Sequence, residues 1–116
     1  MTASNIYDTA NQLERDLRAL PAYTKIKEAF EAIEQNETSK ALFAEYKEAI
    51  QTFQAKQMAG AQLEEAEIQG FQALSERVMA DDNIRSLMEN EQQISQVMTD
   101  INNIITKPLQ ELYEGR

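Results

Sequence analysis

Four glutamates in the second half of the chain are the residues whose type could most readily support chemistry. They are Glu64, Glu67, Glu89 and Glu91. Paired carboxylates inside a helical bundle can bind metal ions or act as general acid and base. A carboxylate-bridged di-iron bundle, however, pairs two glutamates with two Glu-x-x-His motifs, and this sequence contains no histidine. We therefore expect no metal site and predict that these carboxylates belong to a solvated face.

Nucleophilic and phosphate-binding chemistry also lacks its usual residues. Cysteine is absent, so the chain has no disulfide, no thiolate nucleophile and no cysteine-bound zinc or iron-sulfur site. Ser75, Ser86 and Ser95 have no imidazole to activate them. Gly60 and Gly70 are isolated, with no glycine-rich loop and no following Lys-Ser or Lys-Thr, so a phosphate cradle is not predicted. We expect no catalytic, cofactor-binding or metal-ligating residues.

Methionine and aromatic side chains indicate an interaction surface more than a reaction centre. Methionine adapts to varied shapes and aromatic residues dominate interface energetics, although an ordinary core is the commoner use of both. Ile50, Ile68 and Ile104 lie to one side of their main apolar stripes, which predicts apolar faces that one copy of the chain does not cover. The candidate protein-binding face comprises Phe43, Tyr46, Phe53, Met58, Phe71, Met79, Met88 and Met98.

The first half of the chain reads as three helices, because its apolar residues recur at steps of three and four. The first helix follows Ser4 as N-cap and ends at Leu20-Pro21. The second begins at this proline and runs to about residue 35. The third is capped by Asn36, runs towards residue 58 and is stopped by Gly60.

The second half predicts a fourth helix over residues 63–79 and a long fifth helix that Asp81 or Asp82 caps. Pro108 lacks a backbone N–H, so we expect the long helix to kink or restart there, with a short C-terminal helix after it. Connections of a few residues predict antiparallel neighbours. The expected fold is therefore all-α: a helical bundle with a long antiparallel hairpin, about five helices plus a short sixth, in one domain over residues 1–116.

The net charge of −9 is unevenly distributed and restricts the partners. Residues 1–58 hold seven Lys/Arg against nine Asp/Glu, whereas residues 59–116 hold four against eleven. This field repels phosphate backbones and anionic lipids, so neither direct nucleic-acid binding nor membrane binding is expected. No segment resembles a signal peptide or reaches the roughly 20 apolar residues of a membrane span, which predicts a cytoplasmic protein.

Three strings resemble a known family: NIYDTANQLERDLR (5–18), KQMAG (56–60) and LMENEQQISQVMTDINNIITKPLQELY (87–113). They are similar to the YheA branch of the YlbF/YmcA family of small helical bacterial proteins. The resemblance implies a cytoplasmic, often dimeric helical bundle without recognised catalytic residues. It also implies an accessory regulatory role, since relatives are linked to competence, sporulation, biofilm formation and RNA processing. The cysteines tied to iron-sulfur binding in a related complex have no counterpart here, which argues against redox sensing.

The leading functional hypothesis is a non-enzymatic adaptor that forms a homodimer or a higher homo-oligomer. Its apolar stripes would self-associate, and its acidic surface would select another protein with a basic surface. Two alternatives remain open: a carboxylate-only metal-dependent enzyme, and a purely structural coiled-coil-like protein.

Overall fold

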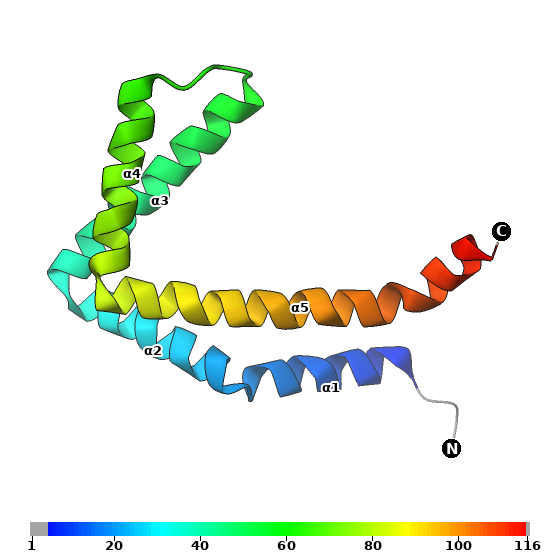
Figure 1. The fold of residues 1–116 in the computed structure, drawn as a ribbon. Coiled ribbons are helices and arrows are strands. Elements are labelled where there is room, and N and C mark those ends of the chain that lie inside the picture. Colours follow the sequence, from blue (N-terminus) through cyan, green and yellow to red (C-terminus); the bar gives the residue numbers. More distant parts are fainter. Residues whose placement is uncertain (1–4, 116) are drawn as a thin grey trace.

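The computed structural model describes residues 5–115 and contains five α-helices and no β-strand within that range. Figure 1 shows α1 and α2 running alongside α5 in the opposite direction, while α3 and α4 project away from α5 as a hairpin. The predicted all-α fold class is therefore confirmed. The helices are α1 (Ile6–Arg18), α2 (Pro21–Gln35), α3 (Glu37–Met58), α4 (Glu65–Ala80) and α5 (Asp82–Glu114).

Helices α1 and α2 follow each other in nearly the same direction, and α4 meets α5 at a steep angle, so the prediction that successive helices are antiparallel is wrong for both pairs (Figure 1). Pro21 occupies the first position of α2, as predicted, where its missing N–H needs no partner. Leu17 of α1 and Tyr23 of α2 both face α5 across one cleft. Both helices therefore run along the same side of α5 (Figure 1), but only α2 has Cα atoms within 8 Å of it.

The N-cap of α1 is Asn5, one residue later than predicted. Its side-chain oxygen accepts a hydrogen bond from the backbone N–H of Tyr7 at 2.8 Å, which satisfies one of the free amides of the first turn. Ser4, the predicted cap, lies outside the described residues.

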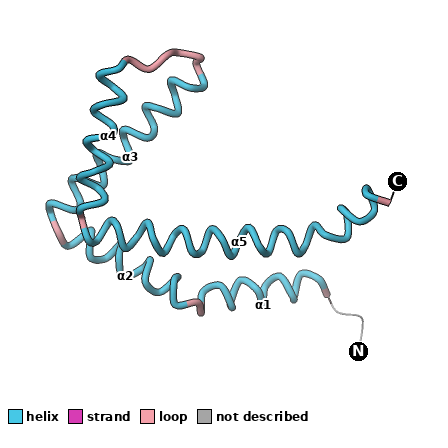
Figure 2. Tube along the Cα trace, in the orientation of Figure 1, coloured by secondary structure: helices cyan, strands magenta, loops and turns pink. Residues whose placement is uncertain are grey.

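Helices α3 and α4 form an antiparallel hairpin whose ends follow from local sequence (Figure 2). Asn36 caps α3 as predicted, because its Oδ1 accepts from the backbone N–H of Ser39 at 3.0 Å. Gly60 adopts a φ of 72°, a conformation that glycine reaches without a steric penalty, and it ends the helix as predicted. Helix α4 begins at Glu65, two residues later than expected, because Glu64 acts as its cap.

Helix α5 is capped by Asp81, whose Oδ1 accepts from the backbone N–H of Ile84 at 3.0 Å. It continues through Pro108 to Glu114, so the predicted short sixth helix is wrong as a separate element. Figure 1 shows the ribbon changing direction in this last part of α5. A proline removes one backbone hydrogen bond but keeps a helical φ, so the helix can bend and continue.

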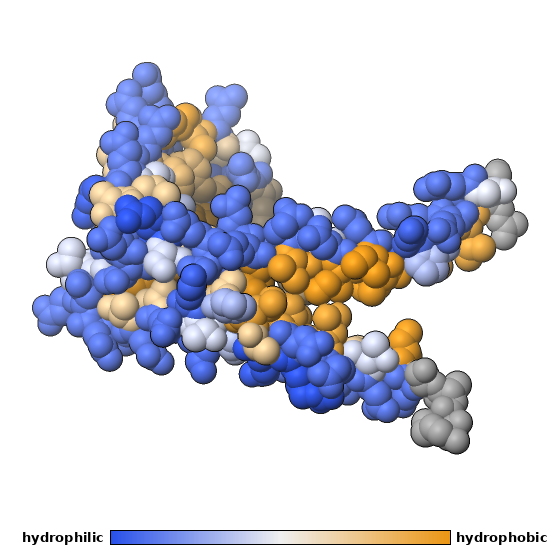
Figure 3. Space-filling model, turned by 60° about the horizontal axis from the view of Figure 1, so that its bottom comes forward, coloured by the Kyte–Doolittle hydropathy of each residue, from blue (hydrophilic) through white to orange (hydrophobic). Residues whose placement is uncertain are grey.

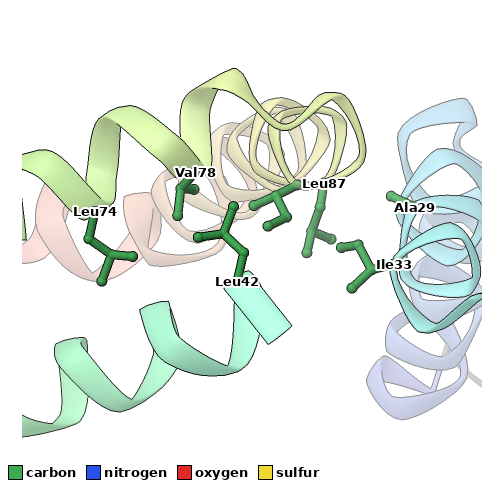
Figure 4. Close-up of a cluster of buried hydrophobic side chains, with 7 residues drawn as sticks. Ala29, Ile33, Leu42, Leu74, Val78 and Leu87 are labelled. Carbon is green, nitrogen blue, oxygen red and sulfur yellow. The ribbon is translucent and has the colours of Figure 1, made fainter. Parts of the chain in front are cut away.

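The hydrophobic core lies where α2, α3, α4 and α5 meet (Figure 4). The most enclosed side chains are Val78, Ile84 and Leu87, with exposed fractions of 1%, 0% and 0%. Helix α2 lies along the first half of α5, and α3 and α4 close the other side of the cluster. The buried cluster comprises Ala29, Ile33, Leu42, Leu74, Val78, Ile84 and Leu87.

A buried polar junction ties the start of α3 to the turn between α4 and α5. Ser39 is 2% exposed, and its hydroxyl donates to Asp81 Oδ2 at 2.7 Å. The same hydroxyl oxygen accepts from Asn83 Nδ2 at 3.2 Å. Asp81 therefore caps α5 with one carboxylate oxygen and holds α3 with the other. Such a satisfied network fixes how the hairpin leaves the core.

The molecule is extended. Its principal extents are 60 × 39 × 18 Å and its Cα radius of gyration is 19.7 Å, whereas a compact domain of this length has a radius near 13 Å. Within residues 5–115, no helix is long and apolar enough to cross a membrane. The extended shape leaves several hollows on the described surface, and two of them have aromatic side chains in their lining: one between α1 and α5 and one in the α3/α4 hairpin.

Candidate protein-interaction site

The first cleft, named here the α1/α5 cleft, lies between the N-terminal helix with the start of α2 on one side and the middle of α5 on the other. No pair of Cα atoms from α1 and α5 lies within 8 Å. Figure 3 shows apolar surface on the side of α5 that faces α1, with a gap between the two arms. The narrow part of this gap has a volume of 250 Å³ and is lined by Glu14, Leu17, Arg18, Tyr23, Ile94 and Met98.

Apolar side chains continue beyond the narrow part of the cleft along both helices. On α5 they recur at three- and four-residue steps, which places them on the face that also carries Ile94. They are much more exposed than core residues: Ile105 is 61%, Leu109 59% and Leu112 60% exposed, and Ile6 of α1 is 75% exposed. Large apolar side chains gathered on one face of a monomer indicate an interaction site.

The accessible surface supports the same conclusion. The chain exposes 9203 Å², whereas a folded monomer of 13.2 kDa typically exposes about 6,400 Å². The excess of about 2,800 Å² is comparable with the area that each partner contributes to a large homodimer interface. One copy of this chain therefore leaves uncovered about as much surface as a second protein would bury.

The second cleft, named here the hairpin cleft, lies between α3 and α4 and has a volume of 330 Å³. Phe53 and Phe71 stand at its centre with ring centroids 4.6 Å apart, and Tyr46 stacks on Phe71 at 5.9 Å. These contacts hold the two helices together while leaving the rings half-buried. The lining residues are Glu45, Glu48, Ala49, Thr52, Phe53, Glu67, Gly70, Phe71 and Leu74.

Glu67 closes the far end of the hairpin. Lys56 of α3 forms an ion pair with its carboxylate, and the backbone N–H of Glu64 donates to Glu67 Oε1 at 3.0 Å. The hydrogen bond from Lys56, followed by that from the Glu64 backbone, lowers the pKa of Glu67 below its ordinary value of 4.5. This carboxylate therefore stabilises the start of α4 and its contact with α3.

We expect this end of the hairpin to weaken in acid. Because folding lowers the pKa of Glu67, its contribution to stability is complete above pH 4.5 and is lost as the pH falls through the folded-state value. In an NMR titration, the side-chain carboxyl of Glu67 should titrate below 4.5 in the natural protein and closer to 4.5 in the Lys56→Met variant. Equal midpoints in the two proteins would contradict this assignment.

The glutamates considered for metal chemistry are not gathered into one site. Glu64 and Glu67 lie together in the capping box of α4, whereas Glu89 and Glu91 lie on α5. In residues 5–115 no group of three or more acidic side chains is placed to hold a metal ion. Stoichiometric iron, manganese or zinc in the purified protein would revive the enzyme alternative.

The three serines considered as nucleophiles are likewise dispersed. Ser75 lies on α4, and Ser86 and Ser95 lie on α5. The Ser86 hydroxyl oxygen is 3.5 Å from Nδ2 of Asn90, a buried side chain that also donates to the Ser86 carbonyl at 2.8 Å. Ser86 therefore takes part in the packing of α5.

The predicted face of methionine and aromatic residues is divided among three places. Residues packed against the core are Phe43, Tyr46 and Met88. Residues lining a cleft are Phe53 and Phe71 in the hairpin and Met98 beside α1. Exposed residues outside both clefts are Met58 and Met79. Of the three off-stripe isoleucines, Ile68 and Ile104 are exposed and Ile50 is half-buried.

The sequence did not predict the α1/α5 cleft or the hairpin cleft, because each is lined by residues from separate helices. A signal for the hairpin cleft was present in Gly70, an isolated glycine inside a helix, which is usually destabilising there. Beyond its chain neighbours and the nearby backbone of α4, a β-carbon added at Gly70 would meet no described atom within 4 Å. Packing within one copy therefore does not require this glycine.

Comparisons with known proteins agree on one family. A family described as "Control of competence regulator ComK, YlbF/YmcA" matches residues 6–110. A UPF0342 protein of Staphylococcus epidermidis is 47% identical over 111 residues, covering 96% of this chain and 97% of that protein. A UPF0342 protein of Staphylococcus aureus is 48% identical over 111 residues, with the same coverage of 96% and 97%.

Two solved structures are similar in fold. A protein of unknown function (DUF964) from Bacillus stearothermophilus superposes with a TM-score of 0.84 and 30% identity, covering 93% of this chain and 95% of that one. The yheA protein from Bacillus subtilis has a TM-score of 0.70 and 30% identity, covering 95% of this chain and 100% of that one. The elongated helical arrangement is therefore shared with experimentally solved relatives.

Proposed function

Because the chain belongs to the YlbF/YmcA family, we propose that it is a non-enzymatic adaptor that pairs with a second copy of itself and binds another protein. The observation that carries this proposal is the α1/α5 cleft, whose apolar faces have no cover within one copy. Catalysis needs polar side chains that converge on one pocket, whereas an adaptor needs an exposed apolar surface that a partner can cover. The part of the chain that the structure describes has such an apolar surface.

A symmetric homodimer is the simplest cover for the α1/α5 cleft. In a two-fold dimer the same patch meets itself, so a chain with one large apolar patch can close both copies at once. The exposed side chains of α1 and α5 in two copies would then form a shared helical bundle with a dry centre. In this arrangement residues 1–116 act as one domain, with the buried cluster joining α2 to α5.

The family description suggests the setting in which the adaptor works. It refers to control of the competence regulator ComK, so we propose an accessory role in bacterial developmental regulation. The resemblance to the YlbF/YmcA family adds a complex that influences RNA processing as an alternative setting. The net charge of −9 favours a protein partner with a basic surface over nucleic acid or an anionic membrane. Loss of the chain should then change ComK-dependent transcription, and unchanged transcription would contradict the competence role.

The dimer is tested by light scattering during size-exclusion chromatography. At micromolar concentration the measured mass should be twice the chain mass of 13.2 kDa, or a higher multiple if pairs associate further. A single species with the mass of one chain would overturn the self-association part of the proposal. Small-angle scattering on the same sample gives a second reading, because pairing that covers α1 and α5 changes the distance distribution of the isolated chain.

A further inference from the structure

We propose that the hairpin cleft binds an amphipathic helix of a different protein, one whose apolar stripe is flanked by lysine or arginine. This inference rests on the proposed adaptor function, since it names the chemistry of the adaptor's partner. It concerns a surface separate from the α1/α5 cleft, because the residues lining the two clefts do not overlap. The α1/α5 cleft would form the contact between two copies of the chain, and the hairpin cleft would bind the partner protein.

The shape and lining of the cleft favour a helix. Phe53, Phe71 and Leu74 provide an apolar floor between two antiparallel helices. A groove between helices is a common seat for the apolar face of a third helix, which inserts side chains spaced by three and four residues. The aromatic rings are already packed on each other at 4.6 Å, so the floor is formed before any partner arrives.

The charge of the cleft favours basic flanks. Its lining includes the carboxylates of Glu45, Glu48 and Glu67 and no lysine or arginine. Glu67 is paired with Lys56, and Glu45 lies 3.6 Å from Arg77. Among the described ion pairs none involves Glu48, whose carboxylate is exposed beside the apolar floor. A lysine or arginine beside the apolar stripe of a docked helix would meet this carboxylate.

A second copy of this chain offers the hairpin cleft no helix with the required basic charge. None of the five helices carries a net positive charge: α3 is neutral, and α1, α2, α4 and α5 are net negative. Insertion of any of them would bring no charge complementarity to the cleft, and insertion of α5 would add repulsion. The occupant must therefore come from a protein of different composition.

Gly70 provides an independent observation at the same place. It lies in the middle of α4, where glycine is unfavourable, and it lines the hairpin cleft. Apart from Gly70, its chain neighbours and the nearby backbone of α4, no described atom lies within 4 Å of the position that a β-carbon would take. Packing within the chain does not require a glycine at this position. Close approach of a docked helix to the α4 backbone would explain it.

The probe is a fluorescein-labelled synthetic peptide of about 18 residues, or five helical turns, built from leucine, alanine and lysine with leucine at three- and four-residue steps. Two control peptides have the same composition in scrambled order, or glutamate in place of lysine. Fluorescence anisotropy is measured at about 150 mM salt, where long-range attraction between exposed charges is screened. We expect only the basic amphipathic peptide to bind. Equal binding of the scrambled peptide would overturn the proposal.

Two variants then locate the binding. Gly70→Gln should raise the urea midpoint of unfolding, because glutamine favours helix, and should weaken peptide binding about tenfold by filling the cleft. Glu48→Lys should also weaken binding about tenfold, whereas Glu89→Lys, with the same change in net charge on α5, should leave it unchanged. If Gly70→Gln becomes more stable and binds as tightly as the natural protein, the proposal is wrong.

Failure of peptide binding at the hairpin cleft can be told apart from failure of the proposed self-association. The oligomeric mass is measured on the same samples, so a dimer that does not bind the peptide overturns the hairpin-cleft assignment alone. The other outcome is a monomer that still binds the peptide, with binding weakened by Gly70→Gln and Glu48→Lys but not by Glu89→Lys. That result supports the hairpin cleft as the binding site and contradicts the proposed dimer.

Discussion

Replacing Leu87 with alanine is expected to lower the free energy of unfolding by about 2–5 kcal/mol, the range for large-to-small substitutions in a core. Leu87 is fully enclosed, at 0% exposed, in the cluster where four helices meet. The cluster is small and the molecule is thin, so few neighbouring side chains can move into the space. Since natural domains are stable by about 5–15 kcal/mol, this single change should remove a large part of the total.

The measurement is urea unfolding followed by circular dichroism, at one fixed protein concentration because pairing would make stability depend on concentration. Glu89→Ala is the matched control, since it lies two residues away on α5 with an exposed side chain. It should change stability by less than about 0.5 kcal/mol. A Leu87→Ala effect as small as this control would mean that Leu87 is not part of the core.

Replacing Ile105 with glutamate should weaken self-association by at least about 100-fold. Ile105 is 61% exposed on the apolar face of α5, so the substitution should leave the isolated fold intact. In a symmetric dimer both copies lose a buried isoleucine, and each such burial is worth about 1.5–3 kcal/mol. The combined loss of about 3–6 kcal/mol corresponds to a factor of about 100 or more in the dissociation constant.

Sedimentation equilibrium or light scattering over a concentration series measures this change, with circular dichroism confirming that the helix content is retained. Gln92→Glu is the matched control, because it adds the same charge on the exposed polar side of α5. The control should associate like the natural protein. If the Ile105→Glu variant does so as well, the dimer interface does not include this face of α5.

The ends of most helices were predictable because they depend on residues close in sequence. Asn36 caps α3 through the amide of Ser39, three positions away, and Gly60 ends the same helix through its own backbone conformation. The apolar stripes were predictable for the same reason, since a period of 3.6 residues determines which side chains share a face. Cap type and fold class followed from these local rules, whereas the number of helices did not, because α5 continues through Pro108.

The candidate sites were not predictable to the same extent. The stripe of α5 is one continuous pattern in the sequence, yet Leu87 is fully buried while Ile105 is 61% exposed. Spacing identifies an apolar face but does not identify what covers it, because the cover comes from helices distant in sequence. The same limit explains why the methionine and aromatic residues, considered as one face, are divided among the core, two clefts and open surface.

The sequence by itself determined the all-α class, the amphipathic stripes, the caps at Asn36 and Asp81, the acidic charge and the absence of cysteine and histidine chemistry. Only the tertiary structure decided that α1 and α2 run in one direction beside α5, that the last helix passes through Pro108, and that the α1/α5 and hairpin clefts stay open. The physical reason is the range of the interactions. Caps and stripes depend on neighbours within one or two turns, whereas a cleft depends on the few buried contacts that orient whole helices.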